Sequence, residues 1–309
     1  MRKIIVIGSG YSGSGAVVEY LTGRPDVSDP FQGHEFRLIQ DPDGLMDLYN
    51  LYKNNYSVQG TSAAINDFIS FWKRIQKHTV LKESAPVEKF IKQITALEYK
   101  AAPYCERIKM NFLKRRLFEY QEKWAHCHGR KPELVTMRIP VDLEQFLLSA
   151  QKFIDEIILS AVAKNKNICV INHGASFWRP VSSTIFYGDR KVIIVTRDVR
   201  DIYSELSTIG RAYPKRDPAL FCSWFRSIME KVEKSEWEHE DVVSVGFEDF
   251  VQNNKDAVIK LSDFLGINQC SNSSYDPEKS KLNIGKFKTI LSMEEIKCIE
   301  SKLKEYCYL

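Results

Sequence analysis

The sequence predicts an α/β fold, in which a parallel β-sheet core is flanked by helices and carries a large helical cap insertion. Three observations predict it: short β-branched runs recur along the 309 residues, helical patterns separate them, and a long helix-rich segment follows the first run. Continuous apolar runs are typical of buried parallel strands. Alternation of such strands with helices is what βαβ units require.

The strand-like runs are each short and apolar, and polar residues or glycine follow them. They lie at residues 3–7, 167–171, 191–196 and 242–245. Residues 36–39 are a candidate further strand.

Between the first two runs, prolines separate a series of helical patterns. These patterns cover residues 45–54, 62–79, 86–99, 106–126 and 143–164. We therefore expect a single domain over residues 1–309, with the core in 1–44 and 166–309 and the cap at about 45–165.

Charge and composition limit the kind of partner. Lys and Arg number 44 against 40 Asp and Glu, a formal net charge of +4, which is too small to indicate a protein that binds nucleic acid along its surface. No run approaches the roughly 20 apolar residues of a membrane span. The seven scattered cysteines contain no C-x-x-C motif. We expect a cytoplasmic protein with no integral membrane segment and no metal site; the sequence does not predict its oligomeric state.

A glycine-rich turn follows the first strand and precedes a helical pattern. The residues that we expect to form a phosphate site there are Gly10, Tyr11, Ser12, Gly13, Ser14 and Gly15. Backbone N–H groups at a helix N-terminus bind phosphate in this context. Gly8, Gly10 and Gly13 also satisfy G-x-G-x-x-G, so a dinucleotide-dependent (NAD or FAD) oxidoreductase is an alternative. That fingerprint requires an acidic residue after the second strand, and Asp26 and Asp29 lie at the right distance but outside any predicted strand.

Arg197 directly follows the strand-like run 191–196. It therefore stands at the carboxyl end of a strand, where open α/β sheets bind ligands, and a guanidinium there can hold a phosphate by two hydrogen bonds. The alternative is a surface ion-pair cluster formed by Arg197 and the charged residues 198, 200 and 201.

Four segments resemble those of one family in the same order. Residues 195–204 (Val-Thr-Arg-Asp-Val-Arg-Asp-Ile-Tyr-Ser) resemble the 3′-phosphate motif of sulfotransferases that use 3′-phosphoadenosine 5′-phosphosulfate (PAPS). The glycine turn stands where that family has its 5′-phosphosulfate loop. Residues 245–267 resemble the family's Tyr-Glu-Asp-Leu strand end and the helix after it, and residues 283–288 resemble its C-terminal Gly-x-Trp-Lys segment.

The resemblance implies a P-loop-like sulfotransferase fold and transfer of a sulfuryl group from PAPS to a hydroxyl or amine of a small-molecule or glycan acceptor, leaving PAP. It implies that Arg197 and Ser204 bind the 3′-phosphate and that Ser12 to Gly15 bind the 5′-phosphosulfate. Lys281, Gly285 and Lys286 would close over the nucleotide.

The chain departs from the family pattern at four places, which include Val199 in place of a proline and Ser280 and Leu282 in the C-terminal segment. The other two concern proposed site residues. Tyr11 stands where the family has a basic residue, which leaves open a non-catalytic PAP-binding protein on the same fold. Ser204 follows Arg197 by seven residues where the family has eight, so Glu205 occupies the usual position, about 100° away on a helix.

For the general base we favour His173, which follows the strand-like run 167–171. An imidazole has the acidity suited to taking an acceptor proton near neutral pH. The alternative is a structural histidine in the turn before Gly174. If the base is a carboxylate, as the resemblance to glycan sulfotransferases allows, Glu83 and Asp41 are the candidates.

Overall fold

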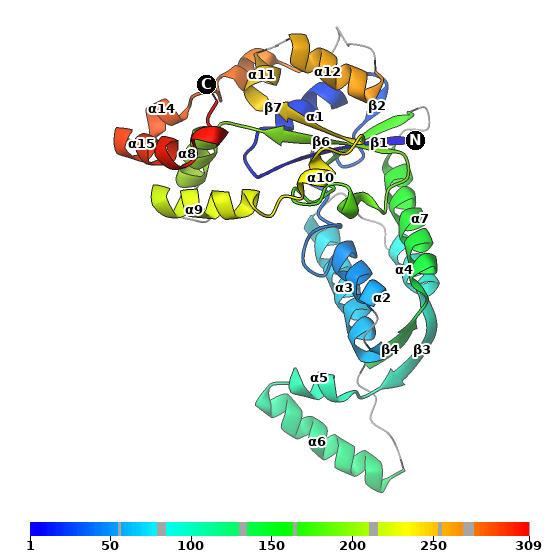
Figure 1. Cartoon of the computed structure of the whole chain (residues 1–309). Coiled ribbons are helices and arrows are strands. Elements are labelled where there is room, and N and C mark those ends of the chain that lie inside the picture. The colour runs from blue at the N-terminus through cyan, green and yellow to red at the C-terminus, as the bar shows by residue number, and fades with distance from the viewer. Residues whose placement is uncertain are drawn as a thin grey trace. The chain divides into compact units, whose positions relative to one another are not determined.

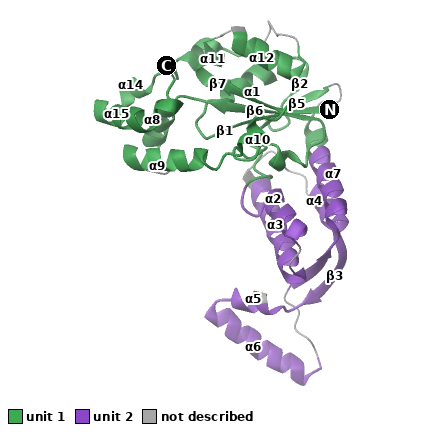
Figure 2. Cartoon of the chain, in the orientation of Figure 1, with its two compact units in different colours: residues 1–40, 157–309 green, residues 41–156 purple. Residues whose placement is uncertain are grey.

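The computed structural model describes residues 1–54, 57–78, 85–129, 135–162, 166–209, 216–252, 255–267 and 275–308. The chain divides into two compact units (Figure 2). Residues 1–40 and 157–309 form the first, and residues 41–156 form the second. For comparison with the second unit, the sequence predicts the cap insertion at about residues 45–165.

The first unit contains a sheet of five strands, all paired in parallel (Figure 1). The strands are β1 (Arg2–Gly8), β2 (Val27–Ser28), β5 (Ile168–Asn172), β6 (Arg190–Thr196) and β7 (Val242–Gly246). Their order in the sheet is β2-β5-β1-β6-β7. The predicted fold class is thus confirmed. The two-residue strand β2 is not predicted by the sequence, because so short a run shows no periodicity.

Both faces of this sheet are buried, which explains the continuous apolar runs. Ile4 and Val6 of β1 join one hydrophobic cluster, whereas Ile5 and Ile7 point to the other face and are also fully buried. The first cluster includes residues of α1 (Ser14–Thr22), α11 (Phe247–Val251) and α12 (Lys255–Leu265).

A second cluster joins α8 (Val199–Ile209), α9 (Pro218–Met229), α14 (Phe287–Ile290) and α15 (Met293–Lys302). The remaining helices of this unit are η1 (Ser182–Thr184), α10 (Lys234–Trp237), α13 (Pro277–Lys281) and η2 (Lys304–Tyr306).

Residues 37–39 lie in a turn and Phe36 has no regular structure, so residues 36–39 do not form the strand that their sequence suggested. Phe36, Leu38 and Ile39 are buried, and the N–H of Phe36 donates to the Asn172 carbonyl oxygen at 2.7 Å. The apolar run therefore reflects burial of a loop, which a short run cannot distinguish from burial of a strand.

The second unit is helical but not only helical. Its helices are α2 (Leu45–Asn54), α3 (Val58–His78), α4 (Ala85–Gln93), α5 (Tyr104–Ile108), α6 (Phe112–Cys127) and most of α7 (Leu143–Ala161). An antiparallel pair, β3 (Thr95–Ala101) and β4 (Val135–Pro140), corrects the prediction of a purely helical cap. The predicted helix 86–99 ends at Gln93, and the chain continues as β3.

Aromatic rings form the core of the second unit. Phe90 and Phe153 stack with their ring centroids 4.5 Å apart, and Phe68, Trp72 and Phe146 pack around them. Over the described ranges, no helix is both long enough and apolar enough to cross a bilayer.

Candidate functional site

The turn between β1 and α1 has a left-handed backbone at three positions. The φ angles are 84° at Gly10, 52° at Tyr11 and 80° at Gly13. A Cβ atom on Gly13 would lie 2.3 Å from Cδ2 of Phe247, so only glycine fits there. This turn leads directly into α1, which begins at Ser14.

The turn presents donors that suit an anion. The Ser12 hydroxyl is buried and has no hydrogen-bond partner among the described residues, a situation that costs about 1–3 kcal/mol when nothing compensates for it. The first N–H groups of α1 have no carbonyl partner within the helix, and they carry the positive end of its dipole. A Cβ on Gly15 would meet no atom within 4 Å, so there is open space beside these donors.

The strand order sets what flanks the turn. Because β1 lies between β5 and β6, the carboxyl ends of these two strands lie on either side of it. His173 directly follows β5, and Arg197 directly follows β6. Two residues predicted separately from the sequence therefore flank one turn, at the kind of position where open α/β sheets bind ligands.

Arg197 is buried, with 8% of its surface exposed, so it does not belong to a surface cluster, although its Nη2 lies 4.0 Å from Oδ2 of the buried Asp201. Its Nη1 donates to the Tyr11 carbonyl oxygen at 3.0 Å, and its Nη2 donates to the Asn283 carbonyl oxygen at 2.7 Å. The guanidinium lies 5.1 Å from the centre of the Phe247 ring. Its Nε has no partner among the described residues.

The neighbouring Arg200 has a different role, because it pairs with Asp198 and Glu300. Asp198 is also tied to α11, the helix that follows β7, since its N–H donates to Oε1 of Glu248 at 2.9 Å. Burial is the main cause that raises the pKa of Glu248. The charged run 197–201 is thus divided between the site and the packing around it.

Asp201 ties the C-terminal segment to α8. Its carboxylate accepts hydrogen bonds from the N–H groups of Gly285 at 2.7 Å and of Phe287 at 2.9 Å. Burial is the main cause that raises the pKa of Asp201, and these two bonds act against it. Gly285, predicted from the sequence, is therefore held near Arg197 by a buried carboxylate.

Ser204 does not present its hydroxyl to this site. The side chain is fully buried, and its Oγ donates to the Asp201 carbonyl oxygen at 2.8 Å. Glu205 lies next to the site instead, with Oε1 3.9 Å from Nη2 of Arg197. The reason is the seven-residue spacing, which turns Ser204 away by about 100°.

The two predicted lysines differ in their surroundings. Nζ of Lys286 donates to Oε1 of Glu205 at 3.3 Å, so it joins the group around Arg197. Nζ of Lys281 donates to Oε1 of Glu278 at 2.5 Å, within the same short helix. Of these two lysines, Lys286 is therefore the one that bonds to Glu205, the carboxylate beside Arg197.

His173 has a constrained backbone and a buried ring. Its φ is 53°, its N–H donates to the Val6 carbonyl oxygen at 2.8 Å, and its carbonyl oxygen accepts from Nε2 of Gln40 at 3.1 Å. Nε2 of its ring lies 3.4 Å from Oγ of Ser14. Burial lowers the pKa of His173, which favours the neutral ring that a base requires.

The two carboxylates considered as bases have no established place here. Glu83 lies outside the described residues. Asp41 belongs to the second unit.

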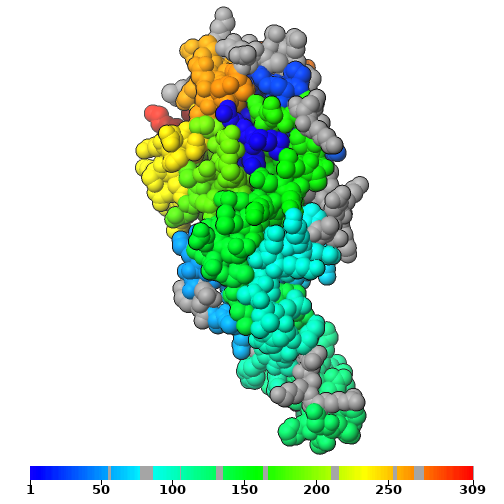
Figure 3. All heavy atoms as spheres, turned by 90° about the vertical axis from the view of Figure 1, so that its right-hand side faces the viewer, coloured from blue at the N-terminus to red at the C-terminus, as the bar shows by residue number. Residues whose placement is uncertain are grey.

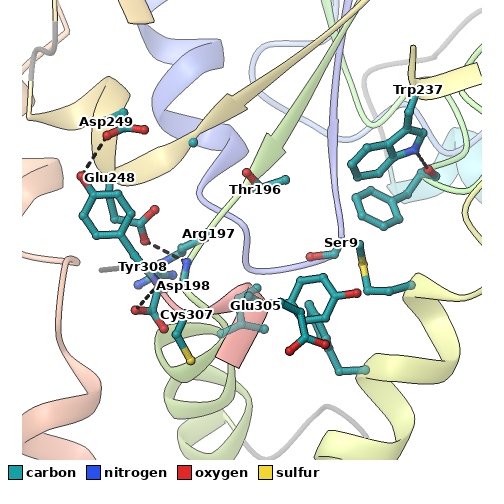
Figure 4. A pocket seen from close by; sticks show the side chains of 16 residues that line it. Ser9, Thr196, Arg197, Asp198, Trp237, Glu248, Asp249, Glu305, Cys307 and Tyr308 are labelled. Atoms are coloured by element: carbon teal, nitrogen blue, oxygen red, sulfur yellow. Dashed lines mark hydrogen bonds between the residues drawn. The ribbon is translucent and has the colours of Figure 1, made fainter. Parts of the chain in front are cut away.

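A cavity of about 420 Å³ opens at the carboxyl ends of β6 and β7 (Figure 4). Its lining includes Thr196, Arg197, Glu248, Asp249 and the C-terminal residues 305–308. Tyr308 links two acidic residues of this lining, Asp249 and Asp198. Its hydroxyl donates to Asp249 at 2.8 Å, and its N–H donates to Asp198 at 3.1 Å. Sequence analysis missed this contribution of the C-terminal residues, because no local pattern marks it.

No protein-family model matches the sequence, and no curated protein is significantly similar to it. Among solved structures, the sulfotransferase domain of the Synechococcus PCC 7002 olefin synthase is similar at 13% identity and a TM-score of 0.47, over 97% of this chain and 94% of that one. A sulfotransferase from Mycobacterium avium is similar at 11% identity and 0.41, over 99% and 76%. Retinol dehydratase in complex with androsterone and inactive cofactor PAP is similar at 10% and 0.37, over 99% and 81%. At this level, such likenesses identify neither a ligand nor a catalytic residue of this chain.

Proposed function

We propose that this protein is an enzyme that transfers a sulfuryl group from PAPS to a hydroxyl or amine of a small-molecule or glycan acceptor. One observation carries the proposal: Arg197 and His173 flank a single glycine turn, because β6 and β5 flank β1. The ordered resemblance of four sequence segments to PAPS-dependent sulfotransferases supports the same reaction.

The residues present fit the two anionic ends of PAPS. Within the described ranges, the Ser12 hydroxyl and Nε of Arg197 have no hydrogen-bond partner. The Ser12 hydroxyl and the N–H groups at the start of α1 suit the 5′-phosphosulfate. Nε of Arg197, together with Lys286, suits the 3′-phosphate. Glu205 opposes this second interaction, because its carboxylate already lies beside both cations.

When bound, PAPS supplies an activated sulfuryl group whose leaving group is PAP. In this proposal, the acceptor hydroxyl replaces the 3.4 Å contact between Ser14 Oγ and Nε2 of His173, and that nitrogen accepts the acceptor's proton. The donors at the start of α1 stabilise negative charge that develops beside them. Positioning and electrostatics dominate group transfers of this type.

The structure disfavours a dinucleotide-dependent oxidoreductase. Asp29 does follow a strand, β2, contrary to the sequence analysis, but β5 separates β2 from β1. Its carboxylate accepts from the N–H groups of Phe31 at 3.0 Å and Gly33 at 2.6 Å, within its own loop. It is therefore engaged away from the turn that would hold the dinucleotide.

The first experiment is a thermal shift of the purified chain with PAP, with AMP, NAD and FAD for comparison. A ligand at a hundred times its dissociation constant stabilises the folded state by about 2.7 kcal/mol. We expect a larger shift with PAP than with AMP. A shift with NAD or FAD and none with PAP would contradict the proposal.

Ser12→Ala and Ser204→Ala form a matched pair for this experiment. Ser12→Ala removes a buried hydroxyl that has no partner in the part of the chain that the structure describes, so the variant should keep its stability and lose part of the PAP shift. Ser204→Ala should leave the PAP shift unchanged, since that hydroxyl bonds to the Asp201 carbonyl.

Sulfuryl transfer from labelled PAPS to a panel of acceptors then separates the enzyme from a non-catalytic PAP-binding protein, which would bind without turnover.

A further inference from the structure

The hairpin of α5 and α6 carries an exposed apolar stripe that the proposed reaction does not use. Four side chains of α6 form it, with exposed fractions of 73% for Leu113, 65% for Leu117, 72% for Tyr120 and 49% for Trp124. At about 100° per residue they fall within an arc of roughly 60° on the helix. Figure 3 draws α5 and α6 as blue-green spheres, with side chains of the hairpin at the molecular surface.

A different face of α6 packs against α5. Phe118 and Ala125 are buried there, and the Arg107 guanidinium lies 5.4 Å from the centre of the Phe118 ring and pairs with Glu122. The hairpin is thus already held together on its own inner face. The exposed stripe is a second apolar face, and α5 does not cover it.

Positive charge borders the stripe on both sides. Arg116 and Lys123 lie about 40–60° from one edge of the stripe, and Lys114 lies about 60° from the other. Among the residues that the structure describes, none of these three forms an ion pair with an acid. The two acids of α6 lie toward the opposite side, where Glu122 pairs with Arg107 and Glu119 pairs with Arg115 at 3.2 Å.

We propose that α6 docks the protein on an anionic lipid surface, with the stripe inserted among the acyl chains near the headgroups. Helices that lie in a membrane interface combine large apolar side chains with flanking Lys and Arg, and Trp and Tyr favour the headgroup level. A second copy of the chain is a poorer occupant, because pairing stripe against stripe brings Lys114, Arg116 and Lys123 of both copies together without acids between them.

The test is sedimentation of the full chain with vesicles of phosphatidylcholine, alone or mixed with phosphatidylglycerol. We expect binding to the anionic vesicles that weakens as salt screens the cations. The double variant Leu113→Ser and Leu117→Ser should weaken binding by more than about tenfold, given the apolar surface that it removes. Lys114→Gln and Lys123→Gln should each weaken it by about fivefold.

Leu148→Ser together with Leu159→Ser is the matched control, because these leucines are 48% and 60% exposed on α7. This control should bind vesicles like the parent chain, and unchanged thermal midpoints would show that all variants are folded. Vesicle binding that is absent, or that the stripe variants leave unchanged, would overturn the proposal. A second result would also overturn it. If the chain does not bind vesicles, and sedimentation velocity shows a dimer that the stripe variant dissociates, the stripe contacts a second copy of the chain.

Discussion

The segments that follow β6 and β5 both border the glycine turn, and they are built in opposite ways. After β6, Arg197 is bound by two backbone carbonyls, and the buried carboxylate of Asp201 holds the C-terminal segment in place. After β5, His173 is fixed through its backbone, and its ring has a 3.4 Å contact with Ser14. The β6 side is therefore a charged network suited to binding, whereas the β5 side presents a single group whose protonation can change.

The largest expected effect comes from the β5 side. His173→Gln should lower the rate of sulfuryl transfer by about 100- to 10,000-fold, the usual contribution of a general base. PAP binding should remain, because the residues proposed for the nucleotide phosphates lie in the turn and beyond β6. Steady-state kinetics and the PAP thermal shift test the two statements separately.

The pH dependence sharpens the same prediction. Because burial lowers the pKa of His173, the rate should fall only as pH drops below the ~6.5 of an ordinary histidine. Because the pKa of His173 is lower in the folded chain than in the unfolded chain, the free energy of unfolding should fall as pH drops below ~6.5. Above that pH, His173 should not affect it. An acid limb of kcat/KM that persists unchanged in His173→Gln would show that another group is the base.

Gly13→Ala tests how tightly the glycine turn packs against Phe247, whose ring lies beside Arg197 on the β6 side. The new Cβ would collide with Phe247, whose ring also contacts Arg197, and the left-handed backbone disfavours alanine. We expect a loss of about 3 kcal/mol in the free energy of unfolding, measured with urea.

Gly15→Ala is the control for that measurement. Its Cβ would meet no atom within 4 Å, and alanine is favoured over glycine within a helix. This variant should gain up to about 1 kcal/mol. Equal losses in both variants would mean that Phe247 does not press against the turn.

Apart from that control, the smallest effect concerns Glu205. Glu205→Gln removes a carboxylate that lies 3.9 Å from Arg197 and bonds to Lys286, so both cations become more available to a 3′-phosphate. PAP affinity should rise by roughly tenfold, measured by calorimetry, while AMP affinity stays the same. Weaker PAP binding would instead indicate that this carboxylate accepts a hydrogen bond from the ligand.

The parallel strands of the core could be predicted because burial on both faces leaves continuous apolar runs, as in residues 3–7. Strand β3 could not, because it pairs with β4, some 40 residues later, and most of its side chains are exposed. Residues 36–39 show the converse, since an apolar run there is buried without pairing. The local sequence therefore indicates which residues are buried more directly than it indicates which strands pair.

The same distinction holds for the candidate site. Arg197 and His173 could be chosen as candidates because each stands at the end of a strand that the sequence predicts. The bonds from Asp201 to Gly285 and Phe287, and those of Tyr308 to Asp198 and Asp249, join segments far apart in the chain. Such pairs follow from the tertiary fold, and no spacing in one sequence reveals them.

Arg197 donates to two of the chain's own carbonyl oxygens, Tyr11 O and Asn283 O. A guanidinium has five N–H groups, and these two bonds use one on Nη1 and one on Nη2, so N–H groups on Nε, Nη1 and Nη2 remain for an anion. The carbonyls fix the plane of the guanidinium before a ligand arrives, so binding to it costs little conformational entropy. Hydrogen bonds to an ionised acceptor are about twice as strong as those between neutral groups, and the remaining donors therefore favour an anion over a neutral nucleoside. Selectivity for charged nucleotides then arises from donors that the protein orients in advance.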